Sequence, residues 1–120
     1  MYVYAIECER GKYFIEAADY VAVSVRNHVN GYSSPWTEKY KPLRVSSLWE
    51  NKDPIKLVYE FMHKYGYQNV RGYNYRGIDL SLEELEEIEQ GVKSVWNRKG
   101  NRSWIVGEDN YIRDISHFDK

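Results

Sequence analysis

The sequence predicts a small α/β (α+β) domain in which a three-stranded sheet is flanked by helices. β-prone stretches alternate with amphipathic helical patterns in the order β-β-α-β-α-α. The chain has 120 residues, of which 42% are hydrophobic, so it can form one core without disulfide bonds. Its single cysteine, Cys8, lies in the first predicted strand, where we expect a buried structural thiol rather than a nucleophile.

The first predicted elements are a β-hairpin and a helix. Residues 2–8 and 13–15 are β-prone, and the turn-forming residues 9–12 separate them. Asp19 can cap a following helix, which the Asn-Gly pair at 30–31 would end. In that helix valine recurs at every fourth position, at Val21, Val25 and Val29. Because valine also favours strands, this helix depends partly on the family resemblance described below.

A loop and a strand come next. Residues 32–42 are rich in turn-forming residues, and residues 43–50 are typical of a strand. Simple alternation predicts that one face of this strand carries Leu43, Val45, Ser47 and Trp49.

Two helices are marked more clearly. Asp53 and Pro54 suit the cap and first position of a helix that Gly66 ends, and residues 68–77 then form a loop. The next helix has a capping box, Ser81 with Glu84, and an acidic first half that complements the helix dipole. We therefore interpret its glutamates as a solvated helix start rather than a metal site. The apolar stripes of the two helices are Leu57, Val58, Phe61, Met62 and Tyr65, and Leu82, Leu85, Ile88, Val92 and Val95.

Charge and composition restrict the function classes. The formal net charge is −1 and the pI is near 6.3, without the basic excess typical of proteins that bind the phosphate backbone. Aromatic residues reach 16%, mostly Tyr and Trp, which suit half-buried surfaces and interfaces. No secretory leader and no run of about 18 apolar residues is present, so we expect neither secretion nor a membrane partner.

Several segments together resemble a known family. They are Tyr2–Tyr4, Tyr13–Glu16, His28–Gly31, Ser34–Pro42 and Lys64–Gly72. The first two resemble the paired GIY and YIG strands of the GIY-YIG endonuclease superfamily, and the others resemble its H-x-N-G, A-W-T-x-x-Y-x-P and K-Y-G-x-x-N-V-R-G segments. The last segment is similar to that of GIY-YIG proteins from large eukaryotic DNA viruses. The resemblance implies a GIY-YIG-like domain over residues 1–78.

A C-terminal helix (79–99) and a tail (100–120) would follow that domain. In the viral subgroup such a helix is often followed by a zinc knuckle, C-x2-C-x4-H-x4-C. The tail has the same spacing, with the ligand positions occupied by Ser103, Val106, Tyr111 and Ser116. These side chains cannot hold zinc, which needs thiolates and imidazole. We interpret the tail as a degenerate zinc knuckle without metal, the alternative being a short loop whose spacing matches by coincidence.

The resemblance also implies that the catalytic groups have been replaced. Tyr4 retains the GIY tyrosine, whereas Phe14 stands in place of the YIG tyrosine and Glu16 in place of its glycine. A carboxylate at Glu16 would repel an approaching phosphate. Ser24 occupies the position of the catalytic arginine, and Pro54 that of the metal-binding glutamate. The resemblance therefore implies a pseudo-nuclease without catalytic residues or cofactors.

Three function classes remain open. The favoured one is a structural, protein-binding component of a larger assembly, such as a minor capsid or virion protein, found in the virion or the host-cell cytoplasm. The second is a nucleic-acid-binding module with weak affinity and no cleavage. The third is an active nuclease with a rearranged site, in which Glu50 or Asp53 would supply the missing carboxylate. Loop aromatics are the interface candidates: Tyr32, Trp36, Tyr67, Tyr73, Tyr75, Trp104 and Phe118. The candidate nucleic-acid contacts are Lys39, Lys41, Arg44, Lys64, Arg71 and Arg76.

Overall fold

The computed structural model describes residues 1–99, and these form an α+β fold around a mixed sheet. The sheet has four strands, not the predicted three, in the order β3-β1-β2-β4. β1 (Tyr2–Cys8) is antiparallel to both β2 (Lys12–Ala18) and β3 (Pro42–Glu50). β4 (Val70–Gly72) runs parallel to β2. The predicted tail, 100–120, lies outside the described residues.

The fourth strand lies within the segment predicted as a loop. It has only three residues, too few for a strand pattern to appear in the sequence. Close backbone approach explains the glycine at its end, because a Cβ on Gly72 would lie 2.3 Å from the carbonyl oxygen of Ile15.

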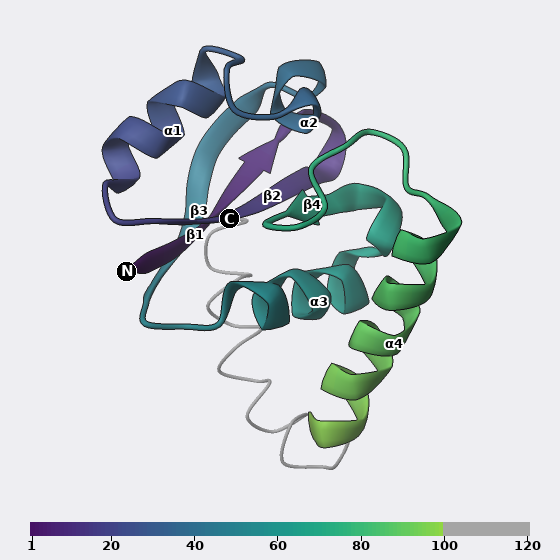
Figure 1. The fold of residues 1–120 in the computed structure, drawn as a ribbon. Coiled ribbons are helices and arrows are strands. Elements are labelled where there is room, and N and C mark those ends of the chain that lie inside the picture. The colour runs from purple at the N-terminus through teal and green to yellow at the C-terminus, as the bar shows by residue number, and fades with distance from the viewer. Residues whose placement is uncertain (100–120) are drawn as a thin grey trace.

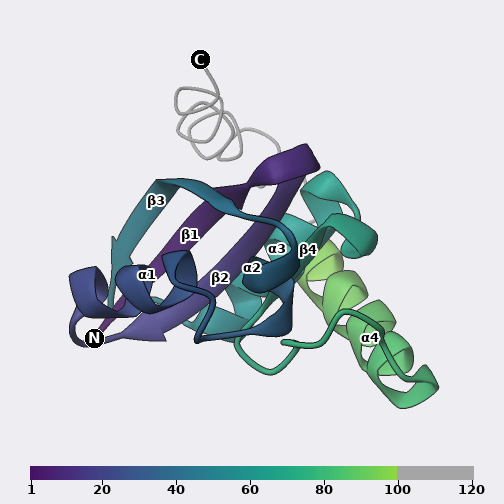
Figure 2. The ribbon, with the colours of Figure 1, turned by 90° about the horizontal axis from the view of Figure 1, so that it is seen from above.

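The helices cover the two faces of the sheet, as Figures 1 and 2 show. α1 (Val21–Val29) and α2 (Pro35–Lys39) lie on one face. α3 (Pro54–Tyr65) and α4 (Leu82–Lys99) lie on the other. Among residues 1–99, no helix combines the length and the apolar character needed to cross a membrane.

Local signals placed the later helices correctly. The Asp53 side chain accepts a hydrogen bond from the backbone N–H of Ile55, and Gly66 ends α3 with a φ of 92°. The capping box is also formed, because Ser81 Oγ accepts from the N–H of Glu84 at 3.0 Å and the Glu84 carboxylate accepts from the N–H of Ser81 at 2.9 Å.

The segment from residue 19 to residue 42 corrects three expectations. The cap of α1 is Tyr20, not Asp19, and no side chain caps this helix. Val21 and Val25 pack toward the sheet as the valine spacing indicates, but Val29 is exposed and His28 is the buried residue of the last turn. α2 lies inside the predicted loop, where the Ser34 side chain accepts from the N–H of Thr37 and caps it.

The strand β3 also departs from simple alternation. Two register shifts interrupt its pairing with β1, and Ser46 and Ser47 are consecutive buried residues. Because a β-bulge reverses the alternation beyond it, Val45 pairs with Ile6 on the α1 face while Ser47 pairs with Ala5 on the α3 face. The predicted single face of this strand is therefore wrong.

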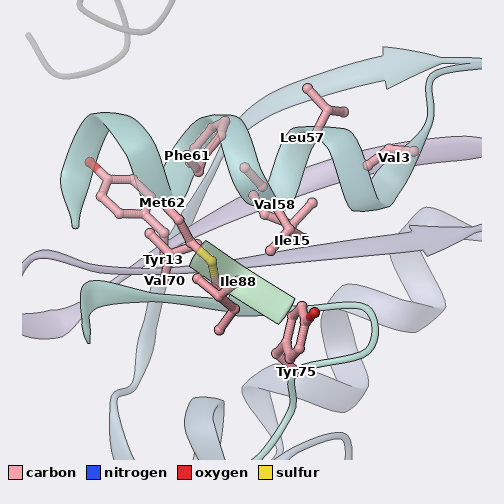
Figure 3. Packing of buried hydrophobic residues seen from close by; sticks show 11 residues of the cluster. Val3, Tyr13, Ile15, Leu57, Val58, Phe61, Met62, Val70, Tyr75 and Ile88 are labelled. Carbon is pink, nitrogen blue, oxygen red and sulfur yellow. The ribbon is translucent and has the colours of Figure 1, made fainter. Parts of the chain in front are cut away.

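The main core fills the space between the sheet and the α3–α4 layer (Figure 3). α3 supplies four of the five residues of its predicted stripe, and the fifth, Tyr65, packs against the cluster. α4 adds Ile88, and the strands β1, β2 and β4 add most of the rest. The buried members are Val3, Ala5, Tyr13, Ile15, Leu57, Val58, Phe61, Met62, Val70, Tyr75 and Ile88. A smaller cluster on the other face contains Tyr4, Ile6 and Cys8. Burial raises the pKa of the Cys8 thiol to about 12, consistent with a structural role.

Candidate functional site

Most of the positions implied by the family resemblance meet on the α1 face of the sheet. Tyr4 on β1 is the direct cross-strand partner of Glu16 on β2, and Phe14 pairs with Ile6 on the same face. α1 places Ser24 above them, within hydrogen-bond distance of Tyr4. Four of the five predicted positions therefore form one cluster in the structure.

The fifth position is separate. Pro54 is the first residue of α3, and α3 packs against the opposite face of the sheet from Tyr4. Asp53, considered as a replacement carboxylate, caps this helix through Ile55.

The Tyr4 hydroxyl is held by protein groups. It lies 2.5 Å from Ser24 Oγ, and the Tyr4 side chain is fully buried. Burial raises the pKa of Tyr4 to about 12, although the hydrogen bond between Tyr4 and Ser24 acts in the opposite direction. The phenol therefore stays protonated at neutral pH and is a poor acceptor for a proton.

His28 forms a second buried polar group beside this tyrosine. Its Nδ1 lies 2.8 Å from Thr37 Oγ1 on α2, and its ring lies 4.8 Å from the Phe14 ring and 6.4 Å from the Tyr4 ring. Its Nε2 is buried and finds no hydrogen-bond partner among residues 1–99. Burial, with a smaller contribution from the Arg76 charge, lowers the pKa of His28 to about 4, so the ring is neutral at pH 7.

Arg76 closes the cluster toward solvent. Its guanidinium forms a two-point ion pair with Glu16, at 2.7 Å and 3.4 Å, and lies 5.1 Å from the centre of the Phe14 ring. It also donates to the carbonyl oxygens of Ser33 and Tyr73. The charge of the Glu16 carboxylate, expected to repel a phosphate, is therefore compensated by Arg76 within the fold.

The interface candidates separate into two groups. Trp36 and Tyr75 are each only 2% exposed, so the expectation that they stand on the surface is wrong. The indole N–H of Trp36 donates to the carbonyl oxygen of Tyr13 at 3.0 Å. The Tyr75 hydroxyl donates to Glu87 at 3.0 Å and lies 2.9 Å from the hydroxyl of Tyr59. Both side chains satisfy their polar atoms inside the fold.

The other interface candidates behave differently. Tyr32, Tyr67 and Tyr73 are 81%, 45% and 42% exposed, respectively. Trp104 and Phe118 lie outside the described residues.

The basic candidates separate in the same way. Arg71 is buried and stacks 4.4 Å from the centre of the Trp36 ring, so it is not available as a nucleic-acid contact. Its guanidinium donates at 2.7–2.9 Å to four backbone carbonyls, those of Tyr67, Val70, Gly77 and Ile78.

The remaining cations are more accessible. Lys39 and Lys41 are exposed and flank Tyr40, and Lys64 is half-buried. Arg44 is exposed and forms a 2.8 Å ion pair with Glu7.

Nowhere in residues 1–99 do three or more His, Cys, Asp or Glu side chains gather in a way that could hold a metal ion. The tail positions Ser103, Val106, Tyr111 and Ser116 lie outside that range.

Sequence reasoning missed the residues that fill the cluster. Thr37 and the pairing of Arg76 with Glu16 carry no local signal, because their partners lie 9 and 60 residues away. The alternation of side chains along the two hairpin strands was an available signal. It places Tyr4, Phe14 and Glu16 on one face of the sheet.

The chain matches no family model, and neither a curated protein nor a solved structure is significantly similar to it. The resemblance to the GIY-YIG superfamily therefore stands on the sequence segments alone, and no comparison supports it.

Proposed function

We propose that this chain is a catalytically inactive GIY-YIG-like domain that acts as a structural, protein-binding component of a larger assembly. In keeping with the viral subgroup that the sequence resembles, the assembly would be a viral particle, with the chain as a minor capsid or virion protein. The protein would reside in the virion, or in the host-cell cytoplasm before assembly.

One observation is the main support for the proposed loss of catalysis. The ion pair between Arg76 and Glu16 covers Phe14 at the place where the resemblance implies that a phosphate should bind. A nuclease needs a free cation for the scissile phosphate, but here the guanidinium is bound by a carboxylate of the same fold. Ser24, which occupies the position that the resemblance gives to the catalytic arginine, is hydrogen-bonded to Tyr4.

Exposed tyrosines support the protein-binding role. Tyr32, Tyr67 and Tyr73 are exposed, and tyrosine is enriched among the residues that dominate binding energy in protein interfaces. A net charge of −1 also gives little long-range repulsion against dense packing with neighbours.

The test is cofractionation with particles from the native source on a density gradient, followed by nuclease treatment. We expect the protein to be stoichiometric with the particle and to remain there after nuclease digestion. Release by nuclease would instead favour a nucleic-acid-binding module, and a freely soluble monomer would contradict both functions.

Surface variants make the test specific. We expect Tyr32→Ala and Tyr67→Ala, combined with Tyr73→Asn, to reduce incorporation into the particle. Asparagine is used at position 73 because that residue has a φ of 51°, which asparagine tolerates. Tyr20→Ala is the matched control, since Tyr20 is as exposed as Tyr32 but is not a proposed contact.

A further inference from the structure

The strand β3 forms one edge of the sheet, as Figure 2 shows. It pairs with β1 on its inner side, and within residues 1–99 no strand pairs with its outer side. An edge strand presents a row of backbone N–H and C=O groups, to which another extended chain can add.

The two halves of this edge differ in how they are protected. The first half begins with Pro42 and contains both register shifts, and proline and bulges are known means of blocking edge pairing. In the second half, Ser47 to Glu50 pair one for one with Ala5 to Tyr2 without irregularity. Only this second half is a regular, open edge.

An apolar side chain stands on the open half. Leu48 is 55% exposed and lies directly opposite Tyr4, on the α1 face of the sheet. α1 leaves it uncovered, although its neighbour Ser47 is buried. Within residues 1–99, the second half of β3 therefore combines backbone groups that no other strand pairs with exposed apolar area.

We infer that this half of β3 pairs antiparallel with the same segment of a second copy, around a two-fold axis at Leu48. A sheet edge is self-complementary under such a rotation, because donors and acceptors exchange places. An axis at Glu50 would oppose two carboxylates, and like charges directly opposite are destabilising. An axis at Leu48 sets each Ser47 opposite Trp49 within the regular segment and keeps the two Glu50 carboxylates away from each other. This contact does not depend on the proposed pseudo-nuclease function.

The first test is oligomeric state, measured by light scattering coupled to size exclusion. We expect the full chain to form dimers at concentrations between about 5 and 200 μM. The dimeric fraction should rise with protein concentration as mass action requires. We expect Leu48→Lys to raise the dimer dissociation constant by about tenfold or more, because two like charges then face each other. Leu43→Lys is the matched control, on the same strand and equally exposed at 57%, and should leave the dimer intact.

The second test reads the register directly. Residues opposite each other in an antiparallel pair have the spacing that a disulfide requires. With oxidised glutathione as the oxidant, Leu48→Cys should form a disulfide-linked dimer and Leu43→Cys should not; Cys8 is buried and gives little background. A wild-type chain that is monomeric at the highest concentration, or equal effects at positions 43 and 48, would overturn the inference.

Discussion

The guanidinium of Arg76 binds the carboxylate of Glu16 at 2.7 Å and 3.4 Å, although the two residues are 60 positions apart. The pair ties the loop after β4 to the middle of β2 and covers Phe14. Charge-assisted, two-point bonds of this kind add geometric specificity as well as free energy.

Arg76→Ala should therefore lower the free energy of unfolding by about 1–2 kcal/mol, because the pair is only partly exposed and Glu16 would lose its partner. Urea denaturation measures this change. Lys93→Ala is the control, since its ion pair with Glu89 is well exposed and should contribute less than about 0.5 kcal/mol. Equal effects of the two substitutions would show that the Arg76 pair has no special role.

The buried His28 predicts a particular pH dependence of stability. Its pKa is about 4 in the folded protein against 6.5 ordinarily, so between these values the unfolded chain binds the proton more readily. The free energy of unfolding should therefore be unaffected by His28 above pH 6.5 and fall as the pH drops toward 4. The contribution of this residue to the free energy of unfolding is at most about 3.5 kcal/mol, at about 1.4 kcal/mol for each pH unit.

The measurement is the unfolding free energy from pH 7 to pH 4 for the wild type and for His28→Gln. We expect the free energy of unfolding to fall less steeply for His28→Gln than for the wild type. Parallel curves for the wild type and His28→Gln would refute the assignment.

The sequence predicted those parts of the fold that depend on local signals. Asp53 with Pro54, and Ser81 with Glu84, specify helix starts through bonds to backbone groups within three residues, and these helices are placed correctly. β4 and the bulges of β3 were not predictable, because they depend on how distant strands meet. A three-residue strand has no period of its own, and an inserted residue changes the facing of a strand without changing its composition.

The candidate site shows the same division. The alternation of side chains in the hairpin was enough to place Tyr4, Phe14 and Glu16 on one face of the sheet. The burial of Trp36 and Arg71 could not, since a loop aromatic and a loop cation read as surface residues until the long-range stack between them is known. For the same reason the interface prediction fails at Trp36 and Tyr75, while Tyr32 is exposed as expected.

The purified protein should not cleave DNA in the presence of Mg²⁺ or Mn²⁺. Phe14, Ser24 and Pro54 lack the hydroxyl, guanidinium and carboxylate that the family chemistry needs, and the Tyr4 phenol has a pKa of about 12. A supercoiled-plasmid nicking assay measures this, with Tyr4→Phe as the matched variant that removes only one hydroxyl. Cleavage by the wild type that disappears in Tyr4→Phe would restore the active-nuclease alternative.

The protein should also contain no zinc. Ser103, Val106, Tyr111 and Ser116 provide neither thiolate nor imidazole at the knuckle positions of the tail. We expect that a chelator leaves the melting temperature unchanged and that elemental analysis of the full chain finds no stoichiometric metal. About one zinc per chain would refute the degenerate-knuckle interpretation.

DNA affinity should be weak and sensitive to salt. With a net charge of −1, and with Arg71 and Arg76 engaged by groups of the protein itself, few counterions can be released on binding. Fluorescence anisotropy with a single-stranded oligonucleotide should show that binding is lost at about 0.15 M salt. Lys39→Ala should weaken the residual low-salt binding, whereas Arg71→Ala should act on stability, because it leaves four carbonyls without their donor. Submicromolar affinity at that salt concentration would favour the nucleic-acid-binding class over the structural one.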